Sequence, residues 1–229
     1  MRLLMVMSST FDPPASASAR LAQLTAFAAP YYRFLDAGLE IALASPQGGA
    51  PPIAWPPSAD AVSPVVVRYR EDRYTRDLLS DTLPLGEIYP EDFDLAFYPG
   101  DYPGNVAAIR ELATNAHSKA LITALWSRAP LGFVGSAVAA LLNVEAPPGE
   151  LLLEGRRVTG ATPGEQRALV GLADETPFLE QQLRARHALY SRGEDWAVNV
   201  IEDGDLITGQ NAQSADLTAA ALMSRARNR

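Results

Sequence analysis

Few residues of this chain combine a reactive side chain with a position that favours chemistry. Asp12 and Asp101 each follow a predicted buried strand and are candidates for acid–base catalysis. Open α/β sheets bind ligands outside the carboxyl ends of their strands, which is where both aspartates are expected. Tyr102 would add a hydroxyl group beside Asp101. The simpler interpretation, which we favour, makes Asp12 a turn residue before Pro13 and Asp101 a solvated loop residue.

Ser136 is a third candidate, as a serine nucleophile at a strand-to-helix turn. A serine hydroxyl needs a base to take its proton near neutral pH. The chain has two histidines, His117 and His187, and both are expected at the surface. Residues 134–137 read Val-Gly-Ser-Ala rather than the Gly-x-Ser-x-Gly pattern of serine hydrolases. We therefore favour a helix N-cap or a polar pocket residue as the role of Ser136.

The lack of cysteine limits the chemistry of this chain more than any other feature. With no cysteine, disulfides, cysteine-rich zinc sites and thiol catalysis are all excluded. The sequence has no phosphate-binding loop, no Rossmann glycine fingerprint and no cluster of metal ligands, so we expect no metal and no cofactor. Glu165 stands at a predicted helix start and could be read as a general acid, but stabilising the helix dipole is the simpler role.

The composition is that of a folded, acidic protein. Of its 229 residues, 48% are hydrophobic, which is enough for a core of its own. The formal net charge of −8 and the scattered arginines argue against nucleic-acid binding, which needs a basic stripe. The apolar run at 3–7 is too short for a signal peptide, and no stretch approaches the ~20 apolar residues of a membrane span. We therefore expect a cytoplasmic protein that binds neither nucleic acid nor membranes.

Short apolar runs alternate with segments of helical periodicity, which is typical of a parallel sheet covered by helices on both faces. Gly135 separates an apolar run from an alanine-rich helix, so we expect it at a sharp turn with a backbone conformation that other residues tolerate poorly. Strands are predicted at 3–7, 39–44, 94–98 and 131–134. Helices are predicted at 16–37, 70–80, 105–126, 137–142, 163–172, 177–187 and 214–223, the last capped by Ser214.

Two further turns contain glycine and predict hairpins. The segment 46–66 is rich in proline and glycine and is predicted to be irregular, within a loop-rich insert around 46–90. No linker divides the chain, so we expect residues 1–229 to form a single domain. The predicted hairpins pair 151–153 with 157–159 around Glu154-Gly155, and 198–200 with 206–208 around Asp203-Gly204.

Short strings spread over nearly the whole chain resemble those of a known family. In chain order they are Pro30-Tyr31-Tyr32, Asp36-Ala37-Gly38, Ala44-Ser45-Pro46, Pro90-Glu91-Asp92-Phe93-Asp94, Tyr98-Pro99-Gly100, Ala139-Ala140-Leu141-Leu142-Asn143-Val144, Val158-Thr159-Gly160 and Leu206-Ile207-Thr208-Gly209-Gln210-Asn211. Together they resemble the ThiJ/PfpI superfamily, which is related to class I glutamine amidotransferases. The length of the insert makes the likeness strongest to the branch of glyoxalase III-like proteins and holding chaperones. The resemblance implies an α/β fold of the flavodoxin-like type, a three-layer sandwich, and a homodimer.

The resemblance also implies where the family's catalytic groups would stand. The cysteine position, counted back from 139–144, falls on Gly135, and the residue after it is Ser136. The position of the glutamate that tunes the thiol, counted back from Pro30, falls on Ala26. The family's paired glycines, whose backbone N–H groups help to bind an oxyanion, become Gly100 and Asp101. The nucleophile and its acid–base partner are therefore both expected to be substituted.

These substitutions leave two classes of function open. In the first, which we favour, the protein lacks glyoxalase and deglycase activity. It binds a small carbonyl or carboxylate in a pocket formed by 100–102 with Gly135 and Ser136, or acts as a chaperone-like homologue. In the second, it is a repurposed lyase, hydratase or isomerase. Such an enzyme would use Asp12 or Asp101 as its acid–base group, together with the backbone oxyanion donors.

Overall fold

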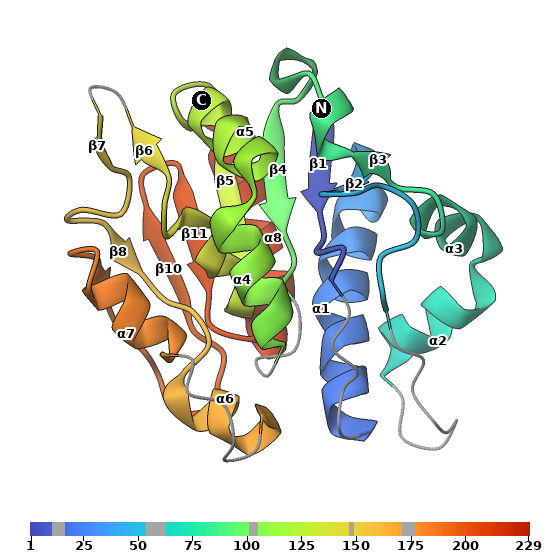
Figure 1. Ribbon diagram of the computed structural model, residues 1–229. Coiled ribbons are helices and arrows are strands. Elements are labelled where there is room, and N and C mark those ends of the chain that lie inside the picture. Colours follow the sequence, from blue (N-terminus) through green and yellow to red (C-terminus); the bar gives the residue numbers. More distant parts are fainter. Residues whose placement is uncertain (11–16, 54–62, 101–104, 147–148, 171–176) are drawn as a thin grey trace.

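A computed structural model describes residues 1–10, 17–53, 63–100, 105–146, 149–170 and 177–229 (Figure 1). Its centre is a seven-stranded sheet in which every neighbouring pair is parallel except β10 and β11. The predicted α/β fold of the flavodoxin-like type is therefore confirmed. In spatial order the strands are β10 (Val200–Asp203), β11 (Leu206–Gly209), β5 (Leu131–Val134), β4 (Leu95–Tyr98), β1 (Arg2–Val6), β2 (Glu40–Ser45) and β3 (Leu83–Pro84).

Helices cover both faces of this sheet, as the alternating pattern predicts. One face carries α1 (Ala17–Asp36), α2 (Pro64–Glu71), α3 (Arg73–Leu79) and α8 (Ala215–Arg227). The other carries α4 (Val106–Thr114), α5 (Ala116–Trp126), the 3-10 helix η3 (Gly135–Leu141) and α7 (Leu179–Arg184). A further helix, α6 (Pro163–Val170), precedes α7 in the chain. Within the described residues, no helix is long and apolar enough to cross a membrane.

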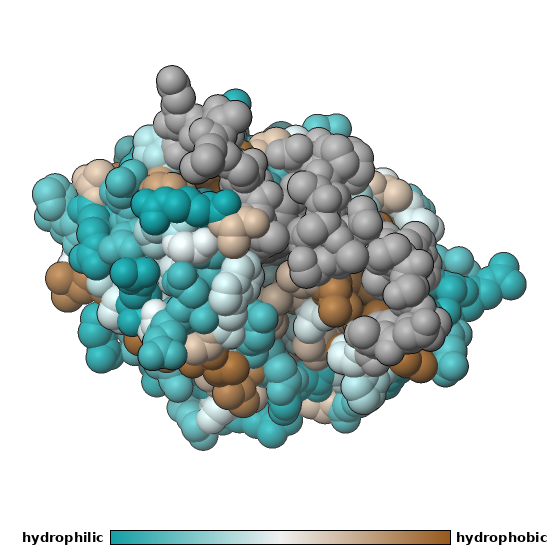
Figure 2. Space-filling model, turned by 90° about the horizontal axis from the view of Figure 1, so that it is seen from below, coloured by the Kyte–Doolittle hydropathy of each residue, from teal (hydrophilic) through white to brown (hydrophobic). Residues whose placement is uncertain are grey.

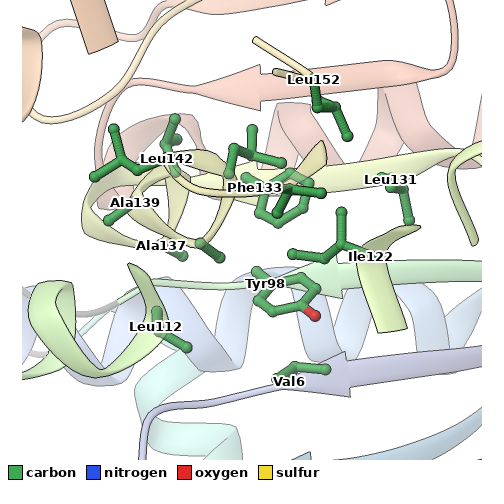
Figure 3. Packing of buried hydrophobic residues seen from close by; sticks show 14 of the residues in the cluster. Val6, Tyr98, Leu112, Ile122, Leu131, Phe133, Ala137, Ala139, Leu142 and Leu152 are labelled. Atoms are coloured by element: carbon green, nitrogen blue, oxygen red, sulfur yellow. The ribbon is translucent and has the colours of Figure 1, made fainter. Parts of the chain in front are cut away.

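Successive strand residues point to opposite faces and feed two cores. On β1, Leu3 and Met5 pack with the residues of α1 and α8, whereas Leu4 and Val6 pack on the side of α4 and α5. In the second core, Tyr98 of β4 stacks on Phe133 of β5 with 4.6 Å between their ring centroids (Figure 3). Both strands are buried along their whole length, and the candidate site lies at their carboxyl ends.

The predicted helix at 70–80 is wrong, because α2 ends at Glu71 and α3 begins at Arg73, where the Asp72 side chain caps it. The irregular segment was expected to extend to residue 66, but α2 begins at Pro64, a residue well suited to the first turn because it needs no hydrogen bond there. The predicted helix 105–126 is two helices that meet at Asn115. Its side chain accepts a hydrogen bond from the backbone N–H of Ser118 at 2.8 Å and so caps the second helix.

Of the two predicted hairpins, one is confirmed and one is wrong. Strands β10 and β11 pair in antiparallel register around Asp203 and Gly204, as expected. The turn at Gly155 joins no hairpin, because β7 (Glu150–Leu151) pairs with β6 (Glu145–Ala146) and β8 (Arg157–Val158) pairs with β9 (Leu189–Tyr190). The strand before Gly155 therefore pairs with its near neighbour β6, and the strand after it pairs with β9, which is distant along the chain.

The expected cap of the last helix is also wrong. The Ser214 side chain makes no capping hydrogen bond to α8. Its hydroxyl instead donates to Oδ1 of Asn211 at 2.9 Å and accepts the backbone N–H of Asn199 at 3.1 Å. Ser214 thus connects the segment after β11 to the segment that precedes β10.

Candidate functional site

The carboxyl ends of β1, β2, β4, β5 and β11 lie at one edge of the sheet, at the bottom of Figure 1. Figure 2 looks onto this edge, where apolar side chains stand among polar ones. Open parallel sheets bind ligands at such an edge because the loops that follow the strands converge there. The candidate site therefore consists of the residues at and just beyond the ends of β4 and β5.

Gly135 forms a sharp turn at the end of β5. It follows Val134 directly and starts η3 with a φ of 57°, in the left-handed region that residues with a Cβ rarely adopt. The expected position and conformation of Gly135 are therefore confirmed. Ser136 comes next and is almost completely buried, at 1% exposure. This strand-to-helix turn, called the elbow below, comprises residues 134–136.

Gly100, just beyond β4, lies directly against the elbow. Its φ is 79°, and a Cβ built on it would stand 2.1 Å from the carbonyl oxygen of Val134. Real Cβ atoms do not approach an oxygen this closely, so only glycine permits the contact. The peptide that ends β4 and the peptide that ends β5 are therefore packed backbone to backbone.

A third segment supports the elbow from the other side. A Cβ on Gly160 would stand 3.3 Å from the carbonyl oxygen of Gly135. The carbonyl oxygen of Gly160 accepts a hydrogen bond from the hydroxyl of Tyr190 at 3.0 Å. Burial raises the pKa of Tyr190 well above its usual value, so the hydroxyl keeps its proton and remains a donor.

The space beside Gly100 is small among the described residues. A cavity of about 20 Å³ lies there, which is room for one water molecule. The carboxylate of Glu111 in α4 holds the start of the adjoining loop after β1. Its Oε2 accepts the hydroxyl of Ser8 at 2.7 Å and the backbone N–H groups of Ser9 and Thr10 at 2.8 and 3.1 Å. The cavity is lined by Met7, Ser8, Gln23, Phe27, Pro51, Pro52, Ile53 and Gly100.

A buried carboxylate organises the next part of the same edge. Glu165 is 0% exposed, and its Oε2 accepts the backbone N–H of Thr162 while the Thr162 hydroxyl accepts the N–H of Glu165. This reciprocal pair is a capping box at the start of α6. Its Oε1 accepts three more hydrogen bonds, from the N–H of Trp196 at 2.8 Å, Nε2 of Gln210 at 3.0 Å and Nδ2 of Asn211 at 2.8 Å. With its acceptors engaged, Glu165 is a structural residue and not a general acid.

Known structures share the fold of this chain. No protein-family model matches the chain, and no curated protein matches it. The 24 kDa rapid encystment protein of Francisella tularensis is 26% identical with a TM-score of 0.84, over 98% of both chains. Glyoxalase III from Candida albicans is 20% identical with a TM-score of 0.81, over 98% of this chain and 96% of its own. A ThiJ/PfpI domain protein from Brachyspira murdochii is 16% identical with a TM-score of 0.64, over 100% and 97%.

The chain has the same fold as glyoxalase III and the ThiJ/PfpI domain protein. The elbow of this chain carries no thiol, since the chain has no cysteine. Helix α1 buries Ala26 to 1% exposure, and a methyl group cannot transfer a proton. Both positions therefore lack a group for covalent or acid–base chemistry.

The two histidines of this chain are not arranged as bases for Ser136. Both are exposed, as expected. His117 lies at the start of α5, with its ring 3.4 Å from the Cβ position of Gly86. His187 follows α7 with a φ of 61°. Ser136 is buried at the elbow, so a serine–histidine pair gains no support.

The other predicted site residues are only partly described. Asp12, Asp101 and Tyr102 lie outside the described residues, so their expected roles stay predictions. Gly100, Gly135 and Ser136 are brought together at the elbow, as the proposed pocket requires. Among the residues that the structure describes, no group of three or more histidine, aspartate or glutamate side chains is arranged to hold a metal ion.

Proposed function

We propose that this chain is a small-molecule-binding ThiJ/PfpI protein that does not perform the cysteine chemistry of its family. The observation that carries the proposal is Gly135 at the elbow with a φ of 57°, in a chain without cysteine. The turn stands where the family strings place the nucleophile, which supports the alignment at this point. Glyoxalase or deglycase activity by a thiolate is therefore not expected.

Without a thiol, the backbone N–H groups around the elbow are the groups that would bind a ligand. Gly100 keeps its close contact with Val134, although no nucleophile needs to be held there. The pocket proposed here consists of Gly100, Asp101, Tyr102, Gly135 and Ser136, and its ligand is a small carbonyl or carboxylate bound by peptide N–H groups. We also propose that the protein is cytoplasmic and a homodimer. Size-exclusion chromatography with light scattering tests the dimer.

Binding of pyruvate, which carries both a carbonyl and a carboxylate, tests the proposal. Saturation-transfer NMR on the wild type should show saturable binding without conversion of the ligand. Gly135→Ala adds a methyl group at the elbow and should weaken binding at least tenfold. Gly155→Ala is the matched control, because Gly155 has a similar φ of 69° but no atom within 4 Å of its Cβ position. Equal binding by both variants would argue against the elbow as the site.

A chaperone-like role predicts a different result. Such a protein would suppress the aggregation of heated citrate synthase and would show no saturable binding of pyruvate. Light scattering of the heated mixture, with and without the chain, distinguishes this alternative from the proposal.

A further inference from the structure

A second cavity of about 490 Å³ lies between α1, α6 and the segment after β11. We propose that this cavity binds a flat, uncharged aromatic molecule stacked on the indole of Trp196. It shares none of its described lining residues with the elbow pocket, so the inference goes beyond the proposed function. The lining residues are Leu21, Ala22, Thr25, Ala168, Trp196, Ala212 and Gln213.

The backbone of Trp196 is held in an unfavourable conformation. Its φ is 65°, and among the described residues only His187 shares a positive φ without being glycine. A residue with a Cβ adopts this region at an energetic cost, which the surrounding structure must offset. Strain of this kind is concentrated at ligand and active sites, so the outlier itself points to a function.

Specific hydrogen bonds hold Trp196 in that conformation. Its N–H donates to Oε1 of the buried Glu165 at 2.8 Å. The next residue, Ala197, donates its N–H to the carbonyl oxygen of Glu194 at 3.2 Å and accepts Nδ2 of Asn211 at 2.9 Å. The same Asn211 also donates to Glu165, so a closed network fixes the turn. The network orders an indole that remains 39% exposed at the cavity, although a core tryptophan would be buried.

The chemistry of the cavity selects the class of ligand. Its volume lies in the range of small-molecule sites, which is roughly 300 to 1,000 Å³. None of its described lining residues is ionised, so a charged ligand would lose hydration without gaining a partner. An indole binds flat rings by stacking. Thr25 and Gln213 offer hydrogen bonds at the wall, which suits an aromatic molecule that carries one hydroxyl or carbonyl group.

Titration with 2-naphthol by isothermal calorimetry tests the proposal. Wild-type protein should bind one equivalent, and naphthalene-2-sulfonate should bind at least tenfold more weakly because it is charged. Trp196→Gly removes the indole while allowing the positive φ, and should weaken 2-naphthol binding at least tenfold. Trp196→Phe should retain part of the affinity. Trp126→Phe is the control, since Trp126 is partly buried against the core on the opposite face of the sheet, and the affinity of this variant should equal that of wild type.

Three results would overturn the proposal: no saturable binding of 2-naphthol to wild type, unchanged affinity in Trp196→Gly, or equal affinity for the sulfonate. Ala212→Phe, which fills the cavity and leaves Trp196 in place, should also abolish binding and guards against misfolding of the glycine variant. Gly135→Ala should leave 2-naphthol binding unchanged while weakening pyruvate binding. The failure of this proposal is therefore separable from the failure of the proposed function.

Discussion

The backbone of Gly100 packs so closely on Val134 that a Cβ at position 100 would stand 2.1 Å from the carbonyl oxygen of Val134. This contact joins the ends of two central strands and can relax only by moving the main chain. Gly100→Ala should therefore lower the free energy of unfolding by about 3 kcal/mol, through overpacking and the strain of a positive φ. Urea denaturation measures the loss.

The control for this prediction is Gly155→Ala. Gly155 has a φ of 69° and open space around its Cβ position, so only the backbone term applies, at about 1 kcal/mol. Equal losses in the two variants would mean that the contact between Gly100 and Val134 contributes nothing.

Glu165→Gln should destabilise the protein although it preserves the shape of the side chain. Both carboxylate oxygens accept N–H groups, so the new NH₂ group must face a donor in either orientation. We expect a loss of about 2 kcal/mol in the free energy of unfolding, the cost of buried polar groups left without partners. Glu154→Gln, at an exposed position, should change it by less than about 0.5 kcal/mol. A neutral Glu165→Gln would contradict the assigned network.

Asp72 predicts a dependence of stability on pH. Partial burial alone would raise the pKa of Asp72, but hydrogen bonds from Thr75 and Tyr32 and the charge of Arg68 outweigh it, and the pKa lies below its usual value. A carboxylate with a lowered pKa stabilises the fold above the unfolded-state pKa, about 3.9, and this stabilisation is lost as the pH falls through the lower folded-state value. Asp72→Asn should therefore be about 1 kcal/mol less stable than wild type at pH 7.

This difference should shrink as the pH falls below about 4, because Asp72 then binds a proton more readily in the unfolded chain than in the folded protein, where its pKa is lower. Urea denaturation at pH 7 and pH 3 measures it. Asp81→Asn, at an exposed position, is the control and should show little difference at either pH. A gap between Asp72→Asn and wild type that is equally large at pH 3 would contradict the assignment.

Local patterns were sufficient to predict most of the sheet. The apolar runs predicted at 3–7, 94–98 and 131–134 correspond to the strands Arg2–Val6, Leu95–Tyr98 and Leu131–Val134, which are buried almost throughout. Hydrophobicity alone predicts a buried strand of this kind. The hairpin at Gly204 was predictable because both of its strands are adjacent to the turn. The predicted hairpin at Gly155 is wrong because β7 pairs with the strand just before it, and β8 pairs with the distant β9, which no turn signal reveals.

Part of the candidate site could likewise be predicted from local sequence, and part could not. The turn at Gly135 could be predicted because an apolar run stops at a glycine before a helix. The role of Glu165 could not, since its partners Trp196, Gln210 and Asn211 lie 31 to 46 residues away in the sequence. Only the capping string from Thr162 to Glu165 was a usable signal. The positive φ of Trp196 could not be predicted from the sequence, because the hydrogen bonds around Glu165 impose it.

The central claim is tested most directly by incubating the wild-type protein with methylglyoxal and measuring lactate formation against buffer. A chain with Gly135 at the elbow and no cysteine should show no conversion above buffer. Saturable turnover by the wild type would contradict this account. It would mean that a group other than a thiol carries the reaction, with Ser136, Asp12 and Asp101 the first residues to replace by alanine.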